Sequence, residues 1–330
     1  MEKNKDVMAV AKAFMRSRII LTAAELDLFT VIDESFTSAE KIAERFGFDR
    51  RALQRVLDCL VTFGLLRKEK EAYSLTDEGA TYSSKHPGSE LPMLLHMSRL
   101  WVTWSDLTEM VKEGADLAQK PPKPMDMDSR RAFIGAMHVI GRTLSEDIAG
   151  SLELTGYRKL LDIGGGSGTY TIAFLKRNPN MKAILFDLKD VIPMARERFS
   201  SEGLLDRVEL IAGDFYSDEL PGGCDLALLS AIIHQNSPQQ NLELYRKAYR
   251  ALDPGGMLLI RDHIMNEQRT WPSEGALFAI NMLVNTRRGD TYTFDETAQG
   301  MKEAGFMDAK LLRWGEKMDC IVGAEKPTKS

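Results

Sequence analysis

The chain has 330 residues, of which 44% are hydrophobic and 28% charged. This composition is typical of a folded soluble protein, and the length is comfortable for two domains. A net charge of -5 disfavours nucleic acid as a partner. No apolar run approaches the ~18 residues that span a membrane. The three cysteines are too widely spaced for a disulfide framework or a metal cluster. We therefore expect a cytoplasmic protein without a membrane span or a metal site.

Residues 1–87 predict a small helical domain that ends in a hairpin. Ser38 is the expected N-cap of a short helix, and the following helix is predicted over Arg50–Phe63. Two short strands are expected at residues 65–68 and 72–75, on either side of a charged turn. Helix, turn, helix and hairpin in this order are typical of a winged helix.

Residues 88–150 predict a helical segment that links the two domains and contributes to the substrate pocket, interrupted by a loop at Lys120–Pro124. In residues 151–330, short apolar runs alternate with segments of helical periodicity, which predicts an α/β domain with a parallel sheet covered on both faces. The expected strands are Lys159–Ile163, Lys182–Phe186, Val208–Ala212, Leu226–Ile233 and Met257–Arg261, with Ala309–Trp314 and Cys320–Ala324 closing the sheet.

A glycine-rich turn follows the first of these strands. A dinucleotide-binding turn reads G-x-G-x-x-G, and its last glycine would fall here on Thr169. The chain instead has the pattern D-x-G-x-G-x-G, formed by Asp162, Gly164, Gly166 and Gly168. This pattern resembles the first motif of Rossmann-like methyltransferases that use S-adenosylmethionine (SAM), in which the acidic residue and the backbone face an amino-acid moiety.

Acidic and aromatic residues end the next two strands. Asp187 and Leu188 follow the second strand, where a carboxylate can accept hydrogen bonds from both ribose hydroxyls. Asp214 and Phe215 follow the third, where they could hold an adenine. Ligands of open α/β sheets bind at this carboxyl edge. Dehydrogenases also use an acidic residue after the second strand, so the glycine spacing is what argues against an NAD-dependent enzyme.

His234 directly follows the predicted strand 226–233 and so lies beside the proposed cofactor site. The next helix begins with a capping box at Ser237 and Gln240. Imidazole has an unperturbed pKa of about 6.5, which suits removal of a proton from a phenol near neutral pH. Position alone leaves two interpretations open: a general base, and a structural histidine bound by loop backbone.

Together these residues resemble the SAM-dependent O-methyltransferases of the caffeate, acetylserotonin and bacterial polyketide type. The resemblance covers nearly the whole chain and includes residues 23–29, 73–76, 252–256 and 304–306. It implies a seven-stranded Rossmann-like domain, an N-terminal winged-helix dimerisation domain that forms a homodimer, and SAM as cofactor. It also implies methyl transfer to a hydroxyl of a small aromatic or polyketide-like acceptor.

Several site residues are implied by the same resemblance. His234 corresponds to the catalytic base, and Asp262 and Asp290 to acidic residues that help to orient it. Ser230 occupies a position near the adenine of the cofactor, where the plant enzymes have a lysine. The expected substrate contacts are Met137, Met282 and Asn285.

The motif at the base departs from the family pattern, because His234 is followed by Gln235 and Asn236 where the family has aspartate and tryptophan. Transfer of the methyl group to carbon, on a pigment or quinone-type acceptor, therefore stays open. A winged-helix DNA-binding regulator is the alternative from another class. Residues 1–85 contain equal numbers of basic and acidic residues, which disfavours it.

Overall fold

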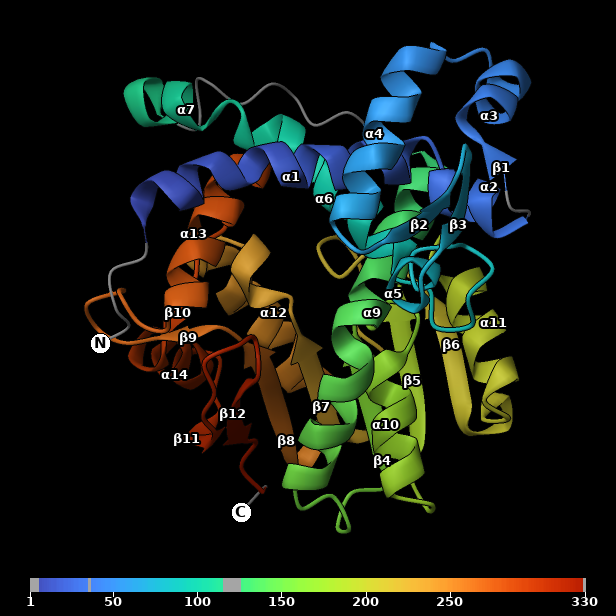
Figure 1. The fold of residues 1–330 in the computed structure, drawn as a ribbon. Helices are drawn as coiled ribbons and strands as arrows, with labels where there is room; N and C mark the ends of the chain where they lie inside the picture. Colours follow the sequence, from blue (N-terminus) through green and yellow to red (C-terminus); the bar gives the residue numbers. More distant parts are fainter. Residues whose placement is uncertain (1–5, 35–36, 115–125, 329–330) are drawn as a thin grey trace. The chain divides into compact units, whose positions relative to one another are not determined.

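The computed structural model describes residues 6–34, 37–114 and 126–328 (Figure 1). The chain divides into two compact units. The N-terminal unit comprises Met1–Val102 and Arg131–Val139, and the C-terminal unit comprises Thr103–Arg130 and Ile140–Ser330. The helical segment expected over residues 88–150 is thus shared between the units. The loop expected at Lys120–Pro124 lies outside the described residues.

The N-terminal unit is built from helices and a small antiparallel sheet with the strand order β1-β3-β2. Its elements are α1 (Val7–Glu25), α2 (Leu28–Glu34), β1 (Thr37–Ser38), α3 (Ala39–Phe46), α4 (Arg50–Thr62), β2 (Leu66–Glu69), β3 (Ala72–Leu75), α5 (Asp77–Ala80), most of α6 (Leu91–Trp104) and part of α9 (Met127–Ser151).

Local sequence signals account for this order. The Ser38 hydroxyl accepts a hydrogen bond from the Lys41 N–H at 3.3 Å, as expected of an N-cap. Helix α4 ends at Thr62, and Gly64 follows with a φ of +79°. The apolar faces of the helices meet the hairpin in one buried cluster around Leu57 and Tyr73. The predicted order of two helices and a hairpin is present, with the two-residue strand β1 as an addition.

The C-terminal unit contains the elements that carry the expected cofactor motif. They are α7 (Leu107–Glu113), β4 (Lys159–Ile163), α10 (Thr169–Arg177), β5 (Lys182–Asp187), α11 (Ile192–Ser201), the 3₁₀ turn η1 (Leu205–Arg207), β6 (Val208–Ala212), β7 (Cys224–Ser230), the 3₁₀ turn η2 (Ile233–Gln235), α12 (Pro238–Ala251), β8 (Leu252–Asp262), β9 (Ile264–Met265), α13 (Ser273–Asn285), β10 (Tyr292–Thr293), α14 (Phe294–Glu303), β11 (Met307–Arg313) and β12 (Cys320–Glu325).

Seven of these strands form one sheet with the order β11-β12-β8-β7-β4-β5-β6. Strands β4 to β8 pair in parallel, and β12 joins antiparallel to β8. Residues of α10 and α11 pack on one face, and residues of α12 and α14 pack on the other (Figure 1). The α/β fold expected from the sequence is confirmed. The chain order reverses between β4 and β7, and such a switch point opens a crevice at the carboxyl ends of the strands.

The strand that leads to His234 is shorter than predicted. It was expected to reach Ile233, but β7 ends at Ser230. Ala231 then adopts a φ of +59°, and His234 lies in the turn η2 rather than directly on a strand end. The turn lifts the chain out of the sheet, because a β ladder cannot continue through a positive φ. Among the described residues, no helix is both long and apolar enough to cross a membrane.

Candidate active site

The glycine-rich turn joins β4 to α10 at the switch point. A Cβ atom on Gly164 would lie 2.7 Å from the Ile232 side chain and 3.3 Å from the Phe215 ring. Gly164, Gly166 and Gly168 all have positive φ, a conformation that favours glycine. Glycine is therefore favoured at these positions by the positive φ and, at Gly164, by the close approach of Ile232 and Phe215.

Asp162 lies beneath this turn and is 1% exposed. Its Oδ2 accepts a hydrogen bond from the Thr171 hydroxyl at 2.5 Å, whereas its Oδ1 has no partner among the described residues. Burial raises the pKa of Asp162 to about 7, although the Thr171 hydroxyl acts in the opposite direction. A cationic group bound nearby would therefore favour loss of the proton from this carboxyl group.

Asp187 ends β5 and closes one side of the turn. Its two carboxylate oxygens accept hydrogen bonds from the N–H groups of Gly166 and Leu188, both at 2.7 Å. Burial raises the pKa of Asp187, and the two N–H donors partly offset that effect. The carboxylate is therefore held in a fixed orientation, with each oxygen keeping capacity for a further hydrogen bond.

The loop after β6 carries Asp214 and Phe215. The Asp214 Oδ1 accepts a hydrogen bond from the Tyr216 N–H at 2.9 Å, and the Phe215 and Tyr216 rings lie 4.6 Å apart. Lys247 of α12 donates to the backbone oxygens of Phe215 and Tyr216 at 2.8 and 3.0 Å. This cation fixes the backbone of the loop, and the Phe215 ring lies close to Gly164.

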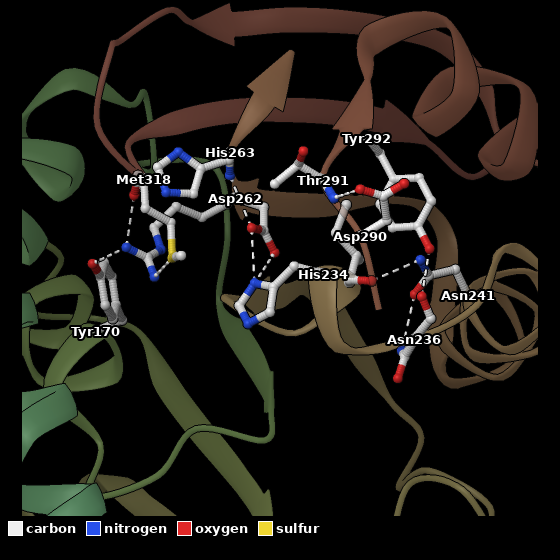
Figure 2. Close-up of polar contacts among 12 residues, drawn as sticks. Tyr170, His234, Asn236, Asn241, Asp262, His263, Asp290, Thr291, Tyr292 and Met318 are labelled. Atoms are coloured by element: carbon white, nitrogen blue, oxygen red, sulfur yellow. Dashed lines mark hydrogen bonds and ion pairs between the residues drawn. The ribbon is translucent and has the colours of Figure 1, made fainter. Parts of the chain in front are cut away.

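The imidazole of His234 is held by Asp262. Its Nδ1 lies 2.9 Å from both carboxylate oxygens of Asp262, which is 1% exposed (Figure 2). Burial acts to raise the pKa of Asp262, but the adjoining His234 and Arg261 hold that pKa below its ordinary value. The carboxylate accepts the Nδ1 proton. Nε2 has no hydrogen-bond partner among the described residues, and the side chain is 12% exposed.

The structure does not bring the Asp290 carboxylate to the imidazole. Asp290 contacts His234 only through the backbone, by donating its N–H to the His234 carbonyl at 2.9 Å. Its carboxylate accepts the Thr291 N–H at 2.8 Å (Figure 2). The same carboxylate lies 3.5 Å from Arg269. The side chain is half exposed. Of the two carboxylates, only that of Asp262 contacts the His234 ring, and Asp290 hydrogen-bonds to the backbone of the turn.

Asn236 gives the unusual His-Gln-Asn sequence a structural meaning. This residue is fully buried, and its side chain donates to Asn241 at 2.9 Å and accepts from the Tyr216 hydroxyl at 2.5 Å. Its backbone oxygen accepts the Tyr292 hydroxyl (Figure 2). Asn236 thus ties the turn that carries His234 to the loop that carries Phe215, a link that no local sequence pattern indicates.

The remaining predicted site residues are distributed between the units. Met137 lies on the part of α9 that belongs to the N-terminal unit. Met282 is buried on α13. Asn285, at the end of α13, is exposed, and its side chain accepts from the Thr103 hydroxyl at 2.8 Å and donates to Asn281 at 2.9 Å. The hydroxyl of Ser230 is buried and has no partner among the described residues.

Three residues near the pair of His234 and Asp262 were not predicted as site residues: Phe278, Arg261 and His263. Phe278 of α13 packs edge-on against the His234 ring, with the ring centroids 4.8 Å apart. It also lies 5.0 Å from the ring of His263, whose pKa burial lowers to about 4. Arg261, His263 and the intervening Asp262 are all buried. Arg261, Asp262 and His263 are consecutive polar residues at the end of an apolar strand, and this pattern could have identified them from the sequence.

Comparison with known families assigns this site to a class. Residues 120–307 match the O-methyltransferase domain, and residues 8–85 match the O-methyltransferase dimerisation domain. The chain therefore belongs to the O-methyltransferase family and is an O-methyltransferase whose cofactor is SAM.

Individual relatives are similar over nearly their full length. The chain is 29% identical to the tetracenomycin polyketide synthesis 8-O-methyl transferase TcmO of Streptomyces glaucescens, with 92% of each chain covered. It is 27% identical to the acetylserotonin O-methyltransferase of Gallus gallus, with 96% of each covered.

Solved structures share the fold. The human N-acetylserotonin methyltransferase in complex with SAM has a TM-score of 0.81 at 23% identity, covering 99% of this chain and 100% of that one. The structure of PigF with SAH has a TM-score of 0.85 at 23% identity, covering 98% of this chain and 100% of that one.

The residues present fit SAM. Three glycines of the turn adopt positive φ, the Asp187 carboxylate is held by the Gly166 N–H with capacity for further donors, and the Phe215 ring lies close to Gly164. The buried, unpaired Oδ1 of Asp162 supplies an acceptor for a cationic group. We propose that Asp162, Gly164, Gly166, Gly168, Asp187, Leu188, Asp214, Phe215 and Ser230 hold the cofactor.

Proposed function

We propose that this O-methyltransferase transfers the methyl group to a hydroxyl of a small aromatic or polyketide-like acceptor, with His234 as general base. The observation that carries the proposal is the contact of both Asp262 oxygens with Nδ1 of His234 at 2.9 Å. The relatives include a tetracenomycin polyketide synthesis 8-O-methyl transferase and an acetylserotonin O-methyltransferase, which supports this class of acceptor.

The proposed chemistry depends on which ring nitrogen of His234 is hydrogen-bonded to Asp262. Asp262 accepts the Nδ1 proton, so the neutral ring presents the lone pair of Nε2. SAM supplies a methyl group that its sulfonium already activates. An acceptor hydroxyl near Nε2 would give up its proton to His234 as the oxygen becomes nucleophilic. The buried carboxylate of Asp262 would then stabilise the imidazolium, and Phe278 would limit the ring's rotation.

Positioning supplies the rest of the rate enhancement. The acceptor oxygen must lie about 3 Å from the methyl carbon and in line with the departing sulfur. Asp187 and the Phe215 loop would fix the nucleoside, while Asn236 joins that loop to the His234 turn. The loop beside the nucleoside and the turn that carries the base would therefore be joined by one hydrogen-bonded network. Met137, Met282 and Asn285 stay our proposed acceptor contacts.

Replacement of the base tests the proposal. His234→Ala should lower kcat by about 10² to 10⁴, the usual contribution of a general base, and leave the affinity for SAM unchanged. His234→Gln is the matched variant, because its amide can still donate to Asp262 but has no basic nitrogen. Turnover would be measured with a panel of hydroxylated aromatic compounds, and SAM binding by calorimetry. Wild-type turnover by both variants would make His234 structural and favour a carbon acceptor.

We also infer that the chain forms a homodimer through its N-terminal unit, residues 1–87 of which we propose as the dimerisation domain. Residues 8–85 match a dimerisation domain. Helix α1 exposes an unusual series of apolar side chains: Val7, Met8, Val10, Phe14 and Met15, each between 49% and 80% exposed. Exposed apolar surface of this extent is typical of a protein interface.

A further inference from the structure

His263 is a buried histidine that the proposed mechanism does not use. It lies between β8 and β9, directly after Asp262, and is 5% exposed. Its Nδ1 is fully buried and has no hydrogen-bond partner among the described residues. Its Nε2 also makes no hydrogen bond to the described residues, but it is not one of the fully buried atoms. Buried polar groups almost always have a partner, so a histidine with two unpaired nitrogens needs an explanation.

His263 shares its neighbours with the proposed base. The Phe278 ring lies 4.8 Å from the His234 ring and 5.0 Å from the His263 ring. His234 and Phe278 are both only partly buried. Asp262, which contacts the His234 ring, also accepts the backbone N–H of His263 at 2.8 Å (Figure 2). The same carboxylate and the same phenyl ring thus contact both histidines, and an aromatic acceptor that reaches His234 is expected beside His263 as well.

The surroundings of His263 keep its ring neutral. Burial lowers the pKa of His263 to about 4. The carboxylates of Asp262 and Asp319 act in the opposite direction, whereas the positive charges of Arg261 and of a protonated His234 add to the effect of burial. His263 therefore stays neutral when His234 has taken up a proton. The two histidines are suited to different tasks: His234 accepts the proton in the proposed mechanism, and His263 can offer a hydrogen bond.

The burial of Nδ1 favours one tautomer of this neutral ring. A proton on Nδ1 would leave a buried N–H group without an acceptor, and unpaired buried N–H groups are rarer in native proteins than unpaired acceptors. The proton is therefore expected on Nε2, the nitrogen of His263 that is not fully buried. His263 thus has one N–H group that a ligand can reach.

We propose that Nε2 of His263 donates a hydrogen bond to a second oxygen of the acceptor, a carbonyl on the aromatic system whose hydroxyl is methylated. The proposal rests on the proposed function and adds a specificity-determining contact to it. A carbonyl suits this donor because it accepts a hydrogen bond without bringing a second anion near the ionised Asp262. The acceptor class is thereby narrowed from simple phenols to hydroxylated aromatic ketones and quinones.

Matched pairs of acceptors test this contact. The acetyl derivatives of α-naphthol carry one carbonyl at different ring positions, and the corresponding isopropenyl derivatives have the same shape without the carbonyl oxygen. With SAM at saturation, the wild type should use at least one acetyl derivative with a kcat/KM about 5- to 10-fold above that of its isopropenyl counterpart. The difference should lie mainly in KM, because the contact is made in the bound ground state as well.

Two substitutions of His263 form a matched pair of variants. The glutamine amide in His263→Gln can place an N–H where Nε2 lies, whereas the shorter amide in His263→Asn reaches only the position of Nδ1. His263→Gln should therefore keep most of the preference for the acetyl derivative, and His263→Asn should lose it. A purely structural role of His263 would instead lower the turnover of acetyl and isopropenyl derivatives alike, in both variants.

Two outcomes would overturn the proposal: equal kcat/KM of the wild type for every acetyl derivative and its isopropenyl counterpart, or an unchanged preference in His263→Asn. If His263→Asn does not fold, nitrogen NMR of the labelled wild type decides. The ring of His263 should be neutral and protonated on Nε2 at neutral pH, and a proton on Nδ1 would contradict the proposal. The proposed function fails separately, by wild-type turnover in His234→Ala, whatever the preference between acceptors.

Discussion

Both carboxylate oxygens of Asp262 lie 2.9 Å from Nδ1 of His234, and this contact selects one tautomer of the imidazole. Asp262 also accepts the His263 N–H at 2.8 Å, so the carboxylate cannot rotate freely. Burial would raise its pKa, but His234 and Arg261 keep that pKa below the ordinary value. An ionised and immobile carboxylate is what a general-base histidine needs behind it.

We expect Asp262→Asn to reduce kcat at least about tenfold, because an amide can present its N–H to Nδ1 and so select the wrong tautomer. Asp290→Asn is the matched control, since the Asp290 carboxylate contacts Thr291 and Arg269 instead of the ring. Its kcat should change much less. Steady-state turnover of the two variants makes the comparison, and equal losses would mean that the orientation of His234 does not depend on Asp262.

The second prediction concerns the nucleoside end of the cofactor. Asp187→Ala should remove the acceptor of two hydroxyl groups and cost roughly 2–3 kcal/mol of SAM binding. Asp187 also fixes the glycine turn through the Gly166 N–H at 2.7 Å. Asp187→Asn keeps one acceptor oxygen for that N–H and should lose less affinity. Calorimetry measures both, and unchanged SAM affinity in Asp187→Ala would remove this residue from the cofactor site.

The third prediction addresses the oligomer. Phe14→Glu places a charge within the exposed apolar series of α1, where Phe14 is 54% exposed in the single chain. Light scattering should give twice the chain mass of 37.0 kDa for the wild type and a shift toward the monomer for the variant. Leu312→Glu, at a 42% exposed position on β11 outside the N-terminal unit, serves as the control and should stay dimeric. A monomeric wild type at micromolar concentration would contradict the inference.

The sequence predicts the strands well, because apolar runs and turn residues are local signals. It also places Asp162, Asp187 and Asp214 at successive strand ends, since parallel topology brings those ends to one edge. The sequence does not predict the direction in which a carboxylate side chain points, even where the position of its backbone is predicted. Asp290 reaches the His234 turn through its N–H, yet its side chain joins Arg269, a long-range contact without a local pattern. The buried positions of Arg261 and Asn236 depend on packing in the same way.

The last prediction is a pH dependence of stability that originates in Asp162. Burial raises the pKa of this carboxyl to about 7 in the folded chain, and the unfolded value is about 3.9. Between these values the native state keeps a proton that the unfolded state loses. The free energy of unfolding therefore decreases as pH rises from about 4 to 7, and the lost stability does not return above pH 7. Without cofactor at pH 8, the wild type carries an ionised Asp162 and should therefore be less stable than a chain with a neutral group at this position.

Asp162→Asn removes the ionisation and keeps an oxygen for the Thr171 hydroxyl, which donates to Asp162 at 2.5 Å. Its melting temperature should exceed that of the wild type at pH 8, and the difference should shrink by pH 5, where the wild-type carboxyl is protonated. Thr171→Val is the matched variant: it removes the hydroxyl that lowers the pKa of Asp162, so the loss of stability should extend to higher pH. Melting curves of the three proteins without SAM measure this. If the melting temperatures of Asp162→Asn and the wild type differ by the same amount at pH 5 and pH 8, the carboxyl group ionises well below this range.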